Sequence, residues 1–244
     1  NSKVSPKNIN EEGPKTDLPE MLGESTPEKY TIDEYYKDDN LGKEVLQNKY
    51  LAPWEKNPYD MWKRIAKAMA NVEKDVDIWY KRFFTLLEDF RFVPGGRIMH
   101  GAGREDITTT LNNCYVVAIK KDSIKSIYDT IQDEAITYKY GGGCGHDLSI
   151  LRPSGSEIGG TGGESCGPTG FMNLFSENTN TIAQHGRRGA NMQTIRIDHP
   201  DVKKFINIKN GNIDMVKYSN ISVLLTHEFM KAVKDDSEFN LTFD

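Results

Sequence analysis

Four glycines lie in the segment Tyr140-Gly-Gly-Gly-Cys-Gly-His-Asp-Leu-Ser-Ile-Leu-Arg-Pro153, where a helical pattern ends and a strand-like pattern, residues 147–150, begins. Glycine permits positive φ and, because it has no Cβ, lets another molecule approach the main chain closely. Arg152 follows the expected strand, and its planar guanidinium suits phosphate or carboxylate. The segment therefore indicates either a helix C-cap or a turn that faces a phosphorylated ligand. These residues alone leave both interpretations open.

The composition limits the class of protein. The 244 residues include 37% hydrophobic residues and carry a net charge of −5. This length allows one large or two small domains, and the absence of a general basic face gives no reason to expect a nucleic-acid partner. No stretch approaches the ~20 apolar residues that cross a bilayer, and no signal-peptide core is visible. We therefore expect a cytoplasmic protein without a membrane or nucleic-acid partner.

The cysteines point to a reducing compartment. Cys114, Cys144 and Cys166 form no CxxC pair, and their number is odd. In a chain without secretory features this indicates reduced thiols. Their spacing relative to His146 or His185 matches no usual zinc pattern, so no metal site is predicted.

Three regions follow one another along the chain. Residues 1–40 are polar and contain several prolines, which predicts a flexible or surface-hugging leader rather than a core element. Residues 41–110 are expected to be helical, with a clear helical period that begins at Asn57-Pro58. In residues 111–244 strands alternate with helices, which is typical of parallel or mixed α/β architecture.

The α/β region has several expected elements. The apolar run Cys114–Ile119 predicts a buried strand, and Asp122 or Ser123 is expected to cap the helix that follows. Residues 153–170 are too long for an ordinary connection, which indicates a functional loop. Further expected elements are helices at residues 171–184 and 200–208, strands at 192–197, 222–225 and 239–243, and a helix capped by Thr226.

Several side chains are candidates for chemistry. Cys114 lies at the amino end of its strand, whereas ligands of parallel sheets bind at the carboxyl ends, so a small core residue is the plain alternative. Arg187 and Arg188 lie between glycines and, with Arg152, form a candidate polyphosphate site; the alternative is a solvated basic loop. Asp122 could accept hydrogen bonds from a sugar hydroxyl or could simply cap a helix.

Several motifs together resemble ribonucleotide reductases. They occur in the family's order and spacing: Pro94-Gly-Gly-Arg-Ile-Met-His-Gly-Ala-Gly103, Leu111-Asn-Asn-Cys-Tyr-Val116, Gly141-Gly-Gly-Cys-Gly-His-Asp-Leu-Ser-Ile-Leu-Arg-Pro153 and Arg187-Arg-Gly-Ala-Asn-Met192. The resemblance covers residues 41–244 and is strongest to the adenosylcobalamin-dependent (class II) catalytic chains. It implies an α/β fold in which an N-terminal helical region precedes the first half of a ten-stranded α/β barrel.

The resemblance also implies roles for individual residues. Cys114 would be one member of the redox thiol pair that reduces the ribose 2′-carbon and ends as a disulfide. Residues 154–161 and 184–191 would be the two specificity loops, the second of which links effector to substrate base. The implied substrate contacts are Gly95, Gly96, Arg97, Asn113, Gly142 and Gly143. The implied contacts of the allosteric effector, a dNTP or ATP, are Asp122, Ser123, Arg152, Gln184, Arg187 and Arg188.

The family's radical cysteine, its second redox cysteine, and the Asn and Glu that assist proton transfer are expected beyond the end of this sequence. Cys144 and Cys166 do not stand in the sequence context that would replace them. The chain alone is therefore expected to be inactive. It would need a C-terminal half of the reductase, nucleotide substrate, adenosylcobalamin and a thioredoxin-like reductant. The resemblance also allows a homodimer.

Two other functions stay open at this point. The chain could be a non-catalytic nucleotide-binding or assembly module, which would bind dNTP without turnover in any mixture. It could also be a fragment of a class I large subunit, which relies on a separate radical-generating subunit and not on cobalamin.

Overall fold

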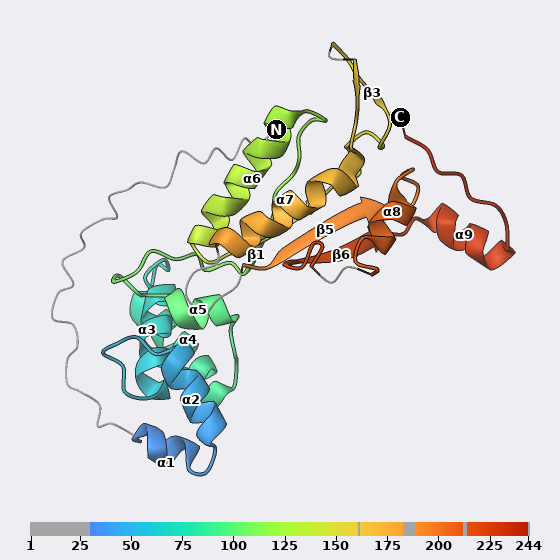
Figure 1. Ribbon diagram of the computed structural model, residues 1–244. Helices are drawn as coiled ribbons and strands as arrows, with labels where there is room; N and C mark the ends of the chain where they lie inside the picture. Colours follow the sequence, from blue (N-terminus) through green and yellow to red (C-terminus); the bar gives the residue numbers. More distant parts are fainter. Residues whose placement is uncertain (1–29, 161, 183–188, 212–213, 244) are drawn as a thin grey trace.

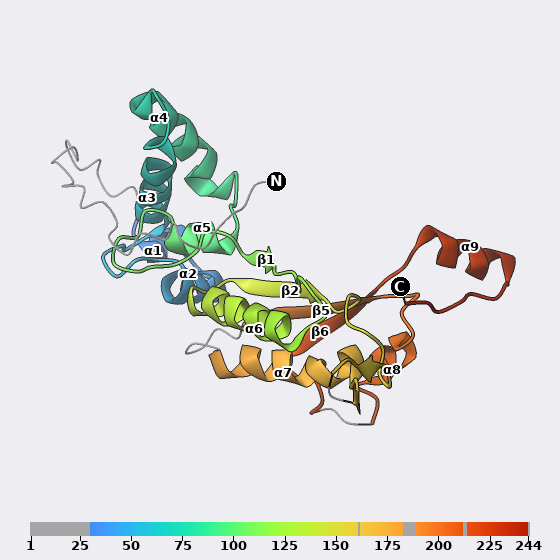
Figure 2. The same cartoon turned by 90° about the horizontal axis from the view of Figure 1, so that it is seen from above.

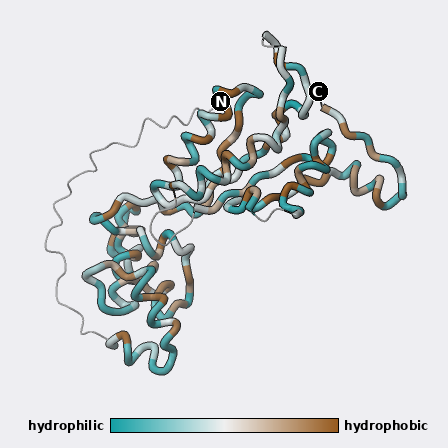
Figure 3. The backbone as a smooth tube through the Cα atoms, viewed as in Figure 1, coloured by the Kyte–Doolittle hydropathy of each residue, from teal (hydrophilic) through white to brown (hydrophobic). Residues whose placement is uncertain are grey.

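The computed structural model describes residues 30–160, 162–182, 189–211 and 214–243 (Figure 1). Helices from the first part of this chain gather at one end of the molecule, and a parallel sheet with its own helices forms the other end (Figure 1). Hydrophobic residues are found in both parts (Figure 3), and they form two separate core clusters.

The helical part is built around one amphipathic helix. Its elements are α1 (Ile32–Tyr36), α2 (Asn40–Lys49), α3 (Pro58–Ala70), α4 (Val76–Leu87), the 3-10 turn η2 (Glu88–Phe90) and α5 (Gly96–Gly101). As predicted, α3 begins at Pro58, and the Asn57 side chain caps it by accepting a hydrogen bond from the backbone N–H of Asp60 at 3.0 Å. Met61 and Ile65, one turn apart, are at most 1% exposed. The apolar stripe of α3 is thus the centre of this core.

Helix α1 lies inside the segment expected to be a flexible leader, and here the expectation is wrong for the described residues. Thr31 and Glu34 form a reciprocal capping box at the start of α1. Ile32 is buried, and the ring of Tyr35 packs against Trp62 with centroids 5.8 Å apart. A helix of five residues is too short to show a clear hydrophobic period and is stabilised by such tertiary contacts. This is why composition alone missed it. The rest of the predicted leader, residues 1–29, lies outside the described residues.

The sheet has four parallel strands in the order β1-β2-β5-β6. Helices α6, α7 and α8 lie on one face of it (Figure 2). This order of a helical region and then a parallel α/β portion confirms the predicted fold class. The elements are β1 (Cys114–Val116), α6 (Ile124–Lys139), β2 (Gly143–Asp147), α7 (Gly167–Ile182), β5 (Asn191–Arg196), α8 (Val202–Asn207), β6 (Ser219–Leu224) and α9 (His227–Asp235).

The two faces of the sheet differ in burial. Residues at alternate positions, such as Cys144, His146 and Gln193, are buried against the helices. The residues between them point to the opposite face, which no helix of the described chain covers (Figure 2). Large side chains stay exposed there: Val116 is 91% exposed and Leu224 is 56% exposed. We call this side, which carries Cys114, Val116, Met192 and Leu224, the uncovered face.

The glycine-rich segment contains both a helix cap and a strand. Gly141, at φ +86°, ends α6: its N–H donates to the carbonyl of Tyr138, and the N–H of Gly142 donates to that of Thr137. This is the Schellman pattern, which confirms the C-cap interpretation. The strand that follows, however, is β2 and starts at Gly143, so the expected strand at residues 147–150 is wrong.

The shifted strand has a physical reason. A Cβ on Gly143 would lie 3.1 Å from the Ala190 Cβ and 3.2 Å from the Ala190 carbonyl oxygen. The strand therefore needs glycine where backbones approach closely, although glycine is depleted in strands generally. Leu148 and Leu151 are buried in the turn beyond the strand, which produced the misleading apolar pattern.

Two further expectations are corrected. β1 has three residues instead of the buried run 114–119, and its side chains are largely exposed because it lies at the edge of the described sheet. Residues 239–243 form no strand; the backbone N–H of Thr242 donates to the carbonyl of Asp198 at 2.7 Å without a ladder. The long loop after Arg152 contains a small antiparallel hairpin, β3 (Glu157–Ile158) and β4 (Gly163–Glu164).

The packing between α7 and β2 can be tested by truncating one side chain. Phe175 is fully buried, and its ring centroid lies 3.9 Å from that of His146. We expect Phe175→Ala to lower the free energy of unfolding by about 3–5 kcal/mol, because it leaves a cavity in this core. Urea unfolding followed by circular dichroism measures the change. Val116→Ala, on the uncovered face, is the control and should change stability by less than about 0.5 kcal/mol; equal effects of the two variants would contradict this packing.

Candidate active site

The predicted substrate residues meet where α5 approaches the start of β2. A Cβ on Gly95 would lie 3.3 Å from the side-chain nitrogen of Asn113. The carbonyl of Asn113 accepts a hydrogen bond of 2.7 Å from the N–H of Gly143. A Cβ on Gly141 would collide with the guanidinium of Arg97. Three segments distant in sequence therefore converge here: Gly95 is exposed, Gly141 is half-buried, and Gly142 and Gly143 are buried.

The other two predicted substrate glycines have aromatic neighbours. Gly96 faces Tyr50, whose hydroxyl would be 3.4 Å from an added Cβ. Gly142 faces the aromatic ring of Tyr115, which an added Cβ would approach to 2.8 Å. At Gly142 a Cβ would therefore displace its neighbours, whereas at Gly96 a Cβ would make only an ordinary van der Waals contact.

Cys114 lies beside this junction. It is the first residue of β1, and the parallel register places it next to Gly143. Its thiol is exposed and lies on the uncovered face of the sheet. The plain alternative of a buried core cysteine is therefore wrong for Cys114, because a one-residue step along the strand decides which face a side chain occupies.

Cys144 has the opposite environment. It is buried against the helices, next to Tyr115 in the register of the sheet. Burial, with a smaller contribution from the charge of Glu134, raises the pKa of the Cys144 thiol to about 12. At neutral pH it is therefore a protonated thiol and a poor nucleophile. Of the two neighbouring cysteines only Cys114 is available for chemistry on the uncovered face.

A buried polar network ties the strands to α6. Glu134 and His146 are fully buried, with the Glu134 Oε1 2.6 Å from the His146 Nδ1. The side-chain amide of Asn191 donates to Glu134 at 3.3 Å and to the Tyr138 hydroxyl at 2.9 Å, and it accepts from Ser219 at 2.6 Å. The sequence analysis missed this network. Its signal was Glu134 itself, a charged residue between the apolar positions of α6.

The predicted effector residues meet at the other end of α6. The Ser123 hydroxyl caps the helix by accepting from the N–H of Ser126 at 3.3 Å. Arg152 donates through Nε to the Asp122 carboxylate at 2.5 Å and through Nη1 to the Glu157 carbonyl at 3.1 Å. The structure therefore brings Asp122, Ser123 and Arg152 together beside the β3–β4 hairpin. Gln184, Arg187 and Arg188 lie outside the described residues.

The two groups of residues are separate. Helix α6 has 16 residues, so its ends lie roughly 24 Å apart at ~1.5 Å per residue. Its amino end holds the Asp122–Arg152 pair and its carboxyl end leads into Gly141–Gly143. One helix thus connects the candidate effector residues with the candidate substrate residues.

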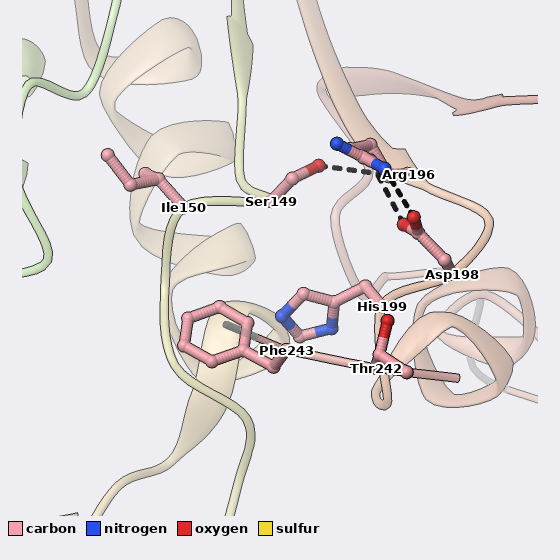
Figure 4. Close-up of a pocket in the computed structure, with 7 residues that line it drawn as sticks. All are labelled: Ser149, Ile150, Arg196, Asp198, His199, Thr242 and Phe243. Carbon is pink, nitrogen blue, oxygen red and sulfur yellow. Dashed lines mark hydrogen bonds and ion pairs between the residues drawn. The ribbon is translucent and has the colours of Figure 1, made fainter. Parts of the chain in front are cut away.

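A pocket at the carboxyl ends of β2 and β5 contains none of these residues (Figure 4). Figure 4 shows Phe243 beside His199 and the Arg196–Asp198 ion pair at its rim. Its volume of about 210 Å³ is below the ~300–1,000 Å³ of typical ligand pockets. Its lining residues are Ser149, Ile150, Arg196, Asp198, His199, Thr242 and Phe243.

Among the residues described, no three or more His, Cys, Asp or Glu side chains are grouped so that they could hold a metal ion. Within the same residues, no helix is both long and apolar enough to span a membrane.

Family models cover both parts of the structure. The model "Ribonucleotide reductase, all-alpha domain" matches residues 36–106, and "Ribonucleotide reductase, barrel domain" matches residues 112–244. The second match alone covers more than half of the chain. The chain therefore belongs to the ribonucleotide reductase family.

Individual relatives agree with this assignment. The chain is 35% identical to a vitamin B12-dependent ribonucleoside-diphosphate reductase of Thermoplasma acidophilum over 67% of its own length and 21% of the relative. It is 31% identical to a vitamin B12-dependent ribonucleoside-diphosphate reductase of Mycobacterium tuberculosis, over 78% of this chain and 29% of the relative. A ribonucleoside-diphosphate reductase subunit alpha of Chlamydia trachomatis is 27% identical over 82% of this chain and 20% of that protein. The chain thus spans between a fifth and a third of the length of these relatives.

The difference between the two neighbouring cysteines predicts selective labelling. We expect iodoacetamide at pH 8 to modify Cys114 and to leave Cys144 unmodified, because Cys144 is buried and this burial raises the pKa of its thiol to about 12. Peptide mass spectrometry identifies the modified residues. Unfolding in guanidinium before labelling should expose both thiols equally, and labelling of Cys144 in the folded chain at the rate of Cys114 would contradict the assignment of faces.

Proposed function

We propose that this chain forms part of a reductase that converts ribonucleotides to deoxyribonucleotides by radical chemistry. In that enzyme it supplies one redox cysteine, part of the substrate site and the allosteric specificity site. The observation that carries the proposal is the exposed thiol of Cys114 on the uncovered face, in register with Gly143 and beside Asn113. A reacting thiol needs access to its substrate, which the exposed position of Cys114 provides.

In the proposed reaction Cys114 acts with a second thiol from the remainder of the enzyme. The bond between the ribose 2′-carbon and its oxygen breaks, the hydroxyl leaves as water, and a new carbon–hydrogen bond forms. The two thiols supply the two electrons and end as a disulfide. A thioredoxin-like reductant then restores the thiols by disulfide exchange.

The other substrate residues would hold the nucleotide in place. Gly142 and Gly143 would line the ribose through their main chain, and the exposed Asn113 accepts a hydrogen bond from the N–H of Gly143. The guanidinium of Arg97, together with Gly95 and Gly96 beside it, would contact the substrate phosphates, because its fork matches phosphate oxygens. The described distances support this grouping.

The second proposed site takes a dNTP or ATP as effector. Asp122 would accept hydrogen bonds from the sugar of the effector, and Arg152, beside Ser123, would contact its phosphates. Gln184, Arg187 and Arg188 complete this proposal through the family resemblance. Because α6 joins the two sites, differences in effector binding have a direct structural route to the substrate glycines.

We also propose adenosylcobalamin as the cofactor of the complete enzyme, since the relatives from T. acidophilum and M. tuberculosis are named vitamin B12-dependent. The remaining proposed partners are a C-terminal half and a second copy of the chain, in the cytoplasm.

Reconstitution tests the proposed activity. The chain is combined with the residues that complete a reductase of this family, a ribonucleotide, an effector, adenosylcobalamin and a dithiol. We expect deoxynucleotide, measured by chromatography, and we expect Cys114→Ser to abolish it because one of the two electron donors is lost. Cys166→Ser is the matched control and should keep the wild-type turnover.

The outcomes separate the alternatives. Turnover that persists in Cys114→Ser would contradict the redox role of this residue. Turnover that does not depend on cobalamin but needs a radical-generating subunit would instead favour a class I enzyme. Nucleotide binding without turnover in every mixture would favour a non-catalytic module.

Effector binding can be tested separately by calorimetry. We expect Arg152→Ala to weaken dNTP binding by about tenfold or more, because a charge-assisted contact to phosphate is lost. Lys125→Ala is the control: this lysine lies in the first turn of α6 and pairs with Asp129 at its surface. Equal dNTP affinity of the two variants would contradict the effector site.

A further inference from the structure

Arg64 is the most highly connected buried cation of the described chain. It lies on α3, and its side chain is 7% exposed. Its guanidinium forms two contacts with the Glu55 carboxylate, Nε to Oε1 at 2.7 Å and Nη2 to Oε2 at 3.2 Å. The Glu55 carboxylate also accepts from the backbone N–H of Ala52 at 2.7 Å. The pair is thus bidentate, buried and fixed on both sides.

The remaining donors of Arg64 reach the carboxyl end of α5. Nη1 donates to the carbonyl of Ala102 at 2.5 Å, and Nη2 donates to that of Met99 at 3.0 Å. These carbonyls belong to the last turn and the C-cap of α5, where helix carbonyls have no partner within the helix. A cation at this end is also favoured by the helix dipole. Arg64 therefore binds the carboxyl end of α5.

Further contacts link Arg64 to the amino end of α5. Nη2 of Arg64 also donates to the carbonyl of Tyr50 at 3.3 Å, and the Tyr50 ring packs against Gly96 in the first turn of α5. Arg97, the next residue, lies against Gly141 at the start of the substrate segment. Because α5 has six residues and spans roughly 9 Å, a shift at its carboxyl end moves its first turn as well.

We propose that Arg64, held by Glu55, is a positioning residue for substrate binding: it fixes the placement of Arg97 relative to Gly141–Gly143 without touching the substrate. The inference rests on the proposed function, in which Arg97 contacts the substrate phosphates. Positioning of this kind affects the formation of the substrate complex, so its loss is expected to raise KM.

A purely stabilising role makes a different prediction, and a double variant distinguishes the two. Arg64→Met leaves the carboxylate of Glu55 buried without a partner, which destabilises the helical core. The double variant Arg64→Met/Glu55→Gln removes both charges, so folding stability recovers. The carbonyls of Met99 and Ala102 still lack their donor, so α5 is still not held.

The test measures KM and kcat for a ribonucleotide in the complete reductase at saturating effector, together with thermal unfolding of each variant. We expect KM to rise about tenfold or more in Arg64→Met, since small misplacements of binding groups cost this much, with kcat nearly unchanged. In the double variant the unfolding temperature should return towards wild type while KM stays raised. If Arg64→Met does not fold, the KM of the double variant alone tests the proposed role of Arg64.

Arg104→Met is the matched control. Arg104 is also buried and bidentate, with Asp106 at 2.6 Å from both Nε and Nη2, but its side chain contacts no carbonyl of α5. It should lower stability without raising KM. A wild-type KM in the double variant, or equal KM values in Arg64→Met and Arg104→Met, would overturn the role of Arg64. A wild-type enzyme without any turnover would instead contradict the proposed function on which it rests.

Discussion

The close approach of three backbones at Gly143 is the constraint on which the rest of the structure depends. The N–H of Gly143 donates to Asn113 on one side, and the N–H of Cys144 donates to Ala190 on the other, at 2.7 and 2.8 Å. An added Cβ at Gly143 would lie 3.1 Å from the Cβ and 3.2 Å from the carbonyl oxygen of Ala190, so the chain beside it would have to shift by a few tenths of an ångström. β2 is an inner strand of the sheet, and its register with β1 places Cys114 beside Gly143.

The alternation of the sheet then divides the chemistry between its two faces. On the helix side, Glu134 contacts His146 and Asn191 in a buried network that links α6 to the strands, while Glu134 Oε2 and His146 Nε2 have no hydrogen-bond partner among the described residues. On the uncovered face the same strands present an exposed thiol and apolar side chains. The hydrogen bonds that this network does make depend on the register of the strands, since a buried polar group that loses its partner destabilises the fold. The buried network on the helix side therefore helps to hold the geometry of the uncovered face, which carries Cys114.

The helical part contributes to the site through α5. Its own core is separate from that of the sheet, yet Arg64 connects this core to the carbonyls at the end of α5. The first turn of α5 reaches the glycine-rich segment through Arg97 and Gly141. The junction between the two parts is thus also where the candidate substrate residues meet, and the placement of one part determines the geometry of the other.

The sequence by itself determined the class of elements, their order and the family, because helical periods, apolar runs and spaced motifs are local properties of the chain. It predicted that Gly141 ends a helix and that Ser123 or Asp122 begins one. It could not locate β2, since strand pairing depends on which distant backbones approach Gly143, and the buried leucines after the strand imitated a strand pattern. Only the tertiary structure decided that Cys114 is exposed and Cys144 buried. Neighbouring strands and covering helices determine which face of a sheet is buried, and no property of the cysteines themselves does so.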